Sequence, residues 1–290
     1  MSESGQTPES PQRSGPDSAP ATDPTTTQAP EAWPFNRPPA LILDPIVQSL
    51  LFIVVVSALF LAWPELDLDF NALFYKDGEG FIVSDLEAFR IVRELNSDII
   101  EIVLWAMLGV LVFKLVLPEL RTLLPPRHML FSFLALLAGP GILVNAVFKP
   151  FSGRPRPVHV EQFGGELTFV GVWDFSGACP SNCSFVSGEA SSALWLVTLA
   201  IFLPAAWRAR AVAAILALTV ILSLNRIAYG GHFLSDVLLS WGMTLTVIAA
   251  LHRWLYVHTP AALTNEALEA ALTRAGFWLR APFRRKRDDA

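Results

Sequence analysis

The stretch that decides the fold runs from residue 46 to residue 63 and reads IVQSLLFIVVVSALFLAW. It holds no charged residue, and an α-helix of this length would extend about 27 Å, close to the thickness of the hydrocarbon core of a bilayer. Trp63 ends the stretch, and tryptophan is enriched where a membrane meets water. We therefore predict a membrane-spanning helix here.

Five more apolar segments follow, so we predict an all-α integral membrane protein, a bundle of six transmembrane helices. The predicted spans cover residues 46–63, 99–117, 129–148, 188–204, 211–224 and 236–256. The fifth must continue through Asn225 and Arg226 to cross the bilayer. Pro140, between two glycines, predicts a kink in the third span. Lys114, near the end of the second, is expected to reach the headgroup layer.

The composition agrees with a membrane protein. Of the 290 residues, 53% are hydrophobic and 16% are charged, whereas soluble domains carry about 25% charged residues. The formal net charge of −5 argues against a nucleic-acid partner, because the field of the protein would repel phosphates. Two cysteines in all exclude a disulfide-rich scaffold and a multi-cysteine metal centre. We infer no protein partner.

The two ends of the chain differ from the predicted membrane domain, residues 41–257. Residues 1–40 are rich in Pro, Ser, Thr and Ala without apolar periodicity, which predicts a disordered tail. Residues 258–290 predict a cytoplasmic amphipathic helix, capped by Thr264 and ending in the basic run 284–287. Such a helix is expected to bind anionic headgroups.

The connection between the first two predicted spans is acidic. Ser84 and Glu87 have the spacing of a capping box and predict a short surface helix. The acidic residues from Glu65 to Glu79 are expected only to face solvent.

Basic residues between the predicted spans set the orientation. Arg121 and Arg127 separate the second span from the third, and Arg208 and Arg210 separate the fourth from the fifth. By the positive-inside rule these connections face the cytoplasm. With six spans, both termini lie there too, and the segments 64–98, 149–186 and 226–236 open outward.

The first outward segment with chemical character begins at the end of the third span. Lys149, Arg154 and Arg156 lie within eight positions, separated by prolines that restrict the backbone. Guanidinium forks suit phosphate oxygens. The alternative is that these cations only neutralise lipid headgroups.

The second segment, Ser187-Gly188-Glu189, opens the fourth span. The N-terminus of a helix presents free N–H groups and a partial positive charge, which suits an anion. The alternative is that the small residues only allow close helix packing.

The third segment contains Arg226, His232 and Asp236. His232 and Asp236 are four residues apart, so on a helix they share one face and the carboxylate can orient the imidazole. An oriented neutral imidazole is a competent nucleophile or base. The alternative, a surface histidine that caps a helix, is disfavoured by Arg226, since a charge at membrane depth is costly.

Together, the segments resemble the type 2 phosphatidic acid phosphatase superfamily in order and spacing. The matching patterns are Lys149-x6-Arg156-Pro157, Ser187-Gly188 and Arg226-x5-His232-x3-Asp236. The resemblance covers residues 41–257. It implies a six-helix membrane fold with an outward-facing active site. It also implies removal of phosphate from a lipid without a metal or another cofactor.

The resemblance also implies a role for each matching residue. His232 would attack phosphorus and form a phosphohistidine, and Asp236 would orient it. The phosphoryl oxygens would be held by Lys149, Arg156, Arg226 and the amides around Ser187 and Gly188. This agrees with the physical interpretation, because phosphoryl transfer mainly needs positioning and charge stabilisation.

Glu189 departs from the family pattern, in which a histidine usually protonates the leaving group. An ionised carboxylate near cations is a poor acid. Glu189 could instead orient a catalytic cation or the attacking water, and His159 is another candidate acid. Cys179 and Cys183 could form a disulfide outside the cytoplasm that holds Ser187 in place, or stay free thiols.

We therefore predict a multi-pass lipid-phosphate phosphatase of the bacterial inner membrane with a periplasmic site. The Cys-x3-Cys-Ser-Phe-x-Ser-Gly-Glu sequence is similar to the bacterial envelope branch of the family, which favours lipid A or a polyprenyl diphosphate as substrate. A diphosphate or an anomeric sugar phosphate would also leave readily without an acid. The alternatives are a lipid phosphotransferase and a non-catalytic lipid-phosphate binder or transporter.

Overall fold

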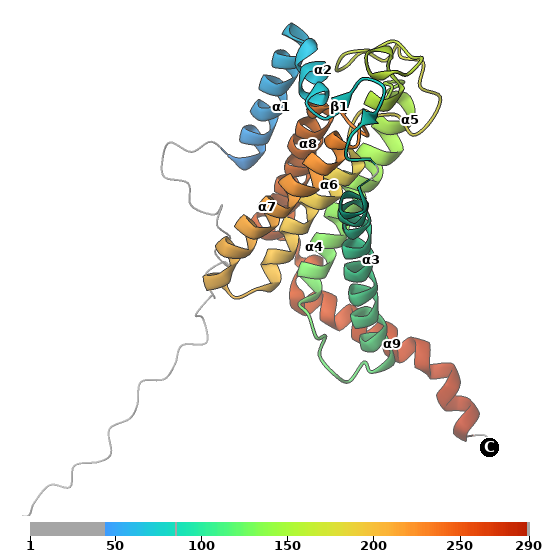
Figure 1. The fold of residues 1–290 in the computed structure, drawn as a ribbon. Helices are drawn as coiled ribbons and strands as arrows, with labels where there is room; N and C mark the ends of the chain where they lie inside the picture. The colour runs from blue at the N-terminus through green and yellow to red at the C-terminus, as the bar shows by residue number, and fades with distance from the viewer. Residues whose placement is uncertain (1–43, 85, 289–290) are drawn as a thin grey trace, which may run out of the picture. The chain divides into compact units, whose positions relative to one another are not determined.

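The computed structural model describes residues 44–84 and 86–288, with side chains up to residue 281. These residues belong to one compact unit (Figure 1). The tail predicted for residues 1–40, and the side chains of the basic run 284–287, lie outside the described residues.

In the described part of the chain, helices dominate. The N-terminal half contains α1 (Pro45–Ala62), α2 (Glu65–Ala72), α3 (Glu87–Val116), α4 (Pro126–Leu136), η1 (Leu137–Phe148) and α5 (Lys149–Phe151). After them come η2 (Pro157–His159), η3 (Glu161–Phe163), α6 (Gly188–Trp195), η4 (Leu196–Phe202), α7 (Ala205–Ala228), α8 (Leu234–His252), η5 (Arg253–Val257), η6 (Ala261–Leu263) and α9 (Asn265–Asp288). A small antiparallel hairpin, β1 (Tyr75–Lys76) and β2 (Gly80–Phe81), follows α2.

Among the residues that the structure describes, five helical segments are long and apolar enough to cross a membrane. They are Pro45–Ala62, Glu87–Val116, Pro126–Phe151, Ala205–Ala228 and Leu234–Val257, and Gly188–Phe202 is a shorter apolar helix. On α1, apolar side chains such as Val54 and Val55 are 61% and 63% exposed, as expected of a face that meets lipid. The prediction of an all-helical, multi-pass membrane protein is confirmed.

Two helices begin earlier than predicted. The expected surface helix and the second span form one helix, α3, whose N-cap is Leu86 without a side-chain cap, so the capping box at Ser84 is wrong. Arg208 and Arg210 lie inside α7, not in a loop before it. Arg208 Nε donates to the carbonyl of Leu203, 2.9 Å away, so the charged group satisfies backbone at the end of the preceding segment.

The third segment widens at Pro140. Residues Leu137–Phe148 form the π-helix η1, which contains Pro140. Proline has no N–H to donate to the turn before it, and a π-helical stretch accommodates that loss. Asn145 Nδ2 also donates to the Pro140 carbonyl at 2.7 Å. This distortion lies immediately before Lys149.

The helices pack around α6 and α8. Helix α8 contacts α1 and α6, while α6 also contacts α7 and η1, an arrangement that can be followed in Figure 1. Trp195 of α6 and Leu239 of α8 are fully buried. The N-termini of α6 and α8 are therefore held close together, and the main cluster of polar side chains lies at these ends.

Helix α9 packs against the C-terminal end of α3. Lys114 is buried, and its ammonium donates to the carbonyls of Pro118 and Leu120 and pairs with Glu269 of α9 at 2.6 Å. The expectation that Lys114 reaches the headgroups is wrong, because the loop and α9 supply its partners. Thr264 accepts from Ala267 N at 3.1 Å, as a helix cap does. Binding of α9 to headgroups stays a prediction.

Candidate active site

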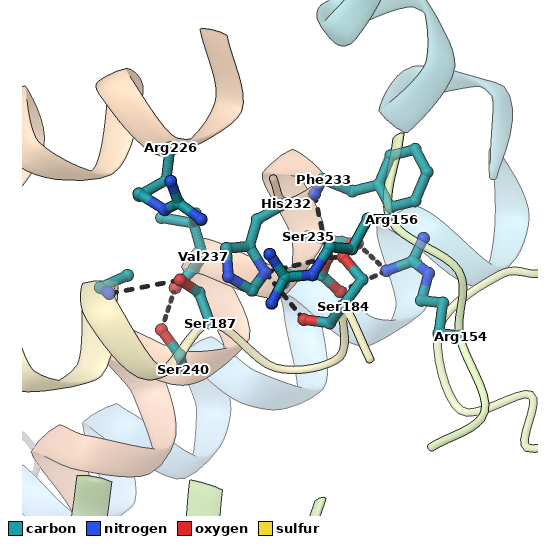
Figure 2. Close-up of polar contacts among 12 residues, drawn as sticks. Arg154, Arg156, Ser184, Ser187, Arg226, His232, Phe233, Ser235, Val237 and Ser240 are labelled. Carbon is teal, nitrogen blue, oxygen red and sulfur yellow. Dashed lines mark hydrogen bonds and ion pairs between the residues drawn. The ribbon is translucent and has the colours of Figure 1, made fainter. Parts of the chain in front are cut away.

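The predicted site residues come together at the ends of four helical segments. Lys149 opens α5, Gly188 opens α6, Arg226 lies in the last turn of α7 and Asp236 in the first turn of α8. His232 occupies the connection between α7 and α8, and Figure 2 shows it between the side chains of Arg226 and Arg156. Lys149 interacts electrostatically with Arg156, Glu189 and Arg226.

His232 is held in one orientation by backbone. Its side chain is 1% exposed, and Nδ1 lies 2.8 Å from the carbonyl oxygen of Ser184. A carbonyl only accepts, so Nδ1 carries the proton and Nε2 keeps its lone pair. Burial lowers the pKa of His232 below its ordinary value of 6.5. A buried, neutral imidazole with one free nitrogen suits a nucleophile.

Asp236 does not hold His232 through the close hydrogen bond that the i, i+4 spacing suggested. Its Oδ2 lies 3.8 Å from His232 Nδ1, whereas it accepts from Ser184 Oγ at 2.5 Å and from Phe233 N at 2.9 Å. Asp236 therefore positions Ser184, whose carbonyl in turn holds the imidazole. The charge of Asp236 also acts on the imidazole directly, across 3.8 Å.

Arg154 is bound to the other carboxylate oxygen of Asp236, Oδ1, and is not available to a phosphate. The guanidinium donates to Asp236 at 2.6 Å, to Asp67 at 2.7 Å and to the carbonyl of Val170 at 2.9 Å. Arg154 and both carboxylates are at most 1% exposed. The grouping of Arg154 with the phosphate-binding cations is thus corrected: buried carboxylates already occupy it.

The expectation that the acidic residues between α1 and α3 only face solvent is wrong for Asp67. Asp67 accepts from Ser235 N at 2.9 Å and from Ser235 Oγ at 2.5 Å. Burial raises the pKa of Asp67, Arg154 opposes the rise, and Asp236 adds to it. Two buried carboxylates therefore share one guanidinium directly behind His232.

Asn71 adds a second contact from α2. It lies one turn after Asp67, is fully buried, and its Nδ2 donates to the carbonyls of Ile227 and His232 at 3.2 and 3.3 Å. Sequence reasoning missed both α2 residues. The available signal was their i, i+4 spacing, which places two short polar side chains on one helix face.

Two of the cations predicted to bind phosphate, Arg156 and Arg226, are held differently. Arg156 Nε donates to the Asn182 carbonyl at 3.0 Å, and the Arg226 guanidinium forms a short ion pair with Glu189. A side chain at Gly231 would lie 2.6 Å from Arg226 Nη2, so glycine leaves the space that this guanidinium needs.

Comparison with known proteins gives a family. A protein-family model described as the PAP2 superfamily matches residues 129–260. A lipid A 4′-phosphatase of Rhizobium leguminosarum is 36% identical over 67% of this chain and 89% of its own length. The chain belongs to the PAP2 superfamily. The family predicted from the three motifs is confirmed.

Two other relatives carry the same name. A lipid A 4′-phosphatase of Rhizobium etli is 49% identical over 40% of this chain and 46% of its own length. One of Francisella tularensis subsp. novicida is 36% identical over 61% of this chain and 81% of its own length. No solved structure gives a significant match.

The second PAP2 motif forms the N-terminus of α6. Ser187 is the N-cap, and its hydroxyl accepts from Ala190 N at 3.2 Å. A side chain on Gly188 would lie 2.6 Å from Asn145 Oδ1, so a larger residue would displace the Asn145 side chain. The proposed contacts of these amides with phosphate stay a prediction.

The loop before this motif is tied to the first motif. Cys179 and Cys183 form a disulfide. Cys179 N donates to the Gly153 carbonyl at 2.9 Å, and Ser184 N donates to the Arg154 carbonyl at 2.8 Å. These contacts hold Ser184, and hence the carbonyl that orients His232.

A mainly apolar cleft leads to the candidate active site, where Lys149, Gly188 and Glu189 line it. It has a volume of about 400 Å³ and is lined by α3, α4, η1, α5 and α6, with Ile100 and Phe133 on its apolar side and Lys149 and Glu189 on its polar side. His159, the other candidate acid, is exposed. In the described part of the chain, the His159 side chain forms no hydrogen bond or ion pair with His232, Arg226 or Glu189.

Proposed function

We propose that this chain is a lipid A phosphatase with six spans, both termini in the cytoplasm and its active site on the outward, periplasmic side of a bacterial inner membrane. The observation that carries the phosphatase proposal is His232, buried and neutral, with Nδ1 tied to the Ser184 carbonyl and with Arg156 and Arg226 beside it. The names of three relatives support lipid A as the substrate.

In the proposed reaction, Nε2 of His232 attacks phosphorus, and the bond between phosphorus and the lipid oxygen breaks. The lipid oxygen takes a proton from solvent water, and the lipid leaves as an alcohol. Water then attacks the phosphohistidine, the P–N bond breaks, and inorganic phosphate leaves with neutral His232 restored. Lys149, Arg156 and Arg226 would stabilise the charge on the phosphoryl oxygens throughout.

Glu189 is proposed to hold a catalytic cation in place. Its carboxylate is already paired with Arg226, which favours this role over donation of a proton to the leaving group. The relatives are named for the 4′ phosphate, whose leaving group is an ordinary sugar hydroxyl. An easy leaving group therefore does not account for a preference for lipid A. The preference for lipid A is therefore proposed to arise in binding, with acyl chains against the apolar side of the cleft.

Phosphate release by the purified protein tests this function. In neutral detergent, lipid A should lose phosphate at least about tenfold faster than phosphatidic acid, since contacts with the larger lipid stabilise its transition state. A polyprenyl diphosphate serves as the third substrate. Equal rates on all three would reject lipid A as the preferred substrate. Release from none would favour a binder or transporter, and phosphate recovered on an added alcohol would favour a phosphotransferase.

Labelling from outside intact cells tests the proposed topology. Phe175, in the loop after the first motif, is 51% exposed, and Leu123, between α3 and α4, is 67% exposed. A membrane-impermeant maleimide should label Phe175→Cys but not Leu123→Cys until the cells are opened. Cys179 and Cys183 are joined to each other, so the native background should be low. The reverse pattern would place the site in the cytoplasm.

A further inference from the structure

One face of α3 is anchored at the active site at two points. The carbonyl of Phe89 accepts from Asn225 Nδ2 at 2.8 Å, and Asn225 is the neighbour of Arg226. Seven residues further on, Asn96 Nδ2 donates to the carbonyl of Glu189 at 3.1 Å. Residues at i, i+4 and i+7 share one helix face. Arg93 is the residue between these anchors, so this face brings it to the edge of the site.

Arg93 lies close enough to Arg226 and Arg156, two of the cations proposed to bind phosphate, to interact with them electrostatically. Its guanidinium lies 6.0 Å from the centre of the Tyr229 ring, which follows Arg226 by three residues. The pKa of Arg156 is lowered, first by burial and further by the positive charge of Arg93, against the opposing charge of Glu189.

Arg93 differs from its neighbour Arg90. Arg90 pairs with Glu87 at 2.5 Å and lies 3.8 Å from Glu94. Arg93 is exposed, and among the side chains described, those of residues 44–84 and 86–281, no carboxylate forms an ion pair with it. Glu189 is already paired with Arg226. A fourth positive charge beside like charges is unfavourable unless an anion lies between them, which makes Arg93 a residue suited to an anion from outside the chain.

We propose that Arg93 binds a second phosphoryl group of the substrate, separate from the one that His232 attacks. The inference rests on the proposed phosphatase function and deepens it: the preferred substrate carries two phosphates. A guanidinium forms two parallel hydrogen bonds with a phosphate. The Tyr229 ring, 6.0 Å from the guanidinium, is within the range of a cation–π interaction.

The test compares Arg93→Gln with a matched control, Arg90→Gln, on the same exposed helix. The substrates are lipid A with two phosphates and the same lipid with only the 4′-phosphate, both in neutral detergent. Arg93→Gln should lower kcat/KM for the doubly phosphorylated lipid about ten- to hundredfold, mainly through KM, because a charge-assisted contact is lost. The singly phosphorylated lipid should change less than about twofold, and Arg90→Gln should leave both unchanged.

Binding to the His232→Ala protein gives a second readout that needs no turnover. There, adding Arg93→Gln should weaken binding of the doubly phosphorylated lipid only. Equal losses on both lipids, or no loss, would overturn the proposal for Arg93. An effect that appears only when anionic phospholipid is added, and is equal for both substrates, would assign Arg93 to membrane headgroups and also overturn it. A wild-type protein that binds both lipids but releases no phosphate would instead reject the phosphatase function.

Discussion

His232→Ala protein should release phosphate from lipid A at least about a thousandfold more slowly than wild type, because the substitution removes the nucleophile itself. The loss should be in kcat, measured as inorganic phosphate released by purified protein. His159→Ala is the matched control: His159 lies in the same outward segment but is exposed, and its substitution should leave the rate within about twofold. Thermal unfolding in detergent checks that both variants fold.

Wild-type activity in folded His232→Ala protein would falsify the phosphohistidine mechanism. The pH profile offers an independent check on the same side chain. The reactive form of His232 is neutral, and burial lowers its pKa from 6.5. As the pH falls, kcat/KM should therefore decline only below pH 6.5. A decline centred well above that value would indicate that another group must be deprotonated.

Arg154→Met should be the most damaging substitution away from the nucleophile. It leaves the carboxylates of Asp67 and Asp236 buried without the guanidinium they share, and breaking a buried ion pair typically costs about 3–5 kcal/mol. Phosphate release should also be lost, because Asp236 no longer fixes Ser184 and the imidazole it orients. Denaturant unfolding of the purified protein in detergent measures the change in stability.

A double variant separates this charge effect from lost packing. Adding Asp67→Asn to Arg154→Met removes one of the two uncompensated carboxylates, so part of the lost stability should return while activity stays low. Asp69→Asn is the matched control, since Asp69 lies on the same helix but is exposed. Equal recovery with Asp69→Asn, or none with Asp67→Asn, would show that the buried charges do not interact as the structure indicates.

Local spacing accounts for the parts of the site that sequence reasoning identified. His232 and Asp236 are four residues apart, and each cation predicted to bind phosphate lies in a short motif at a predicted helix end. Asp67 and Arg154 are 87 residues apart. No periodicity in the chain indicates a pairing at that separation, so the acidic segment could only be interpreted as solvated.

The same limit applies to the fold. Runs of uncharged apolar residues mark α1 and most of the other long helices, because a helix that crosses the hydrocarbon core of a bilayer needs apolar side chains. The start of α3 is polar and carries no such signal, although its helix continues without a break to Val116. The contact of α9 with Lys114 depends on tertiary packing, which hydropathy does not describe.

The buried link between α2 and the catalytic motifs has a consequence for chimeric proteins and for divergence within the family. The family model matches residues 129–260, so Asp67 and Asn71 lie outside the stretch by which members are identified. A chimera that joins this stretch from one homologue to the first helices of another must inherit a compatible partner for Arg154. Positions 67, 154 and 236 should therefore change together during evolution, even where the recognised motifs stay the same.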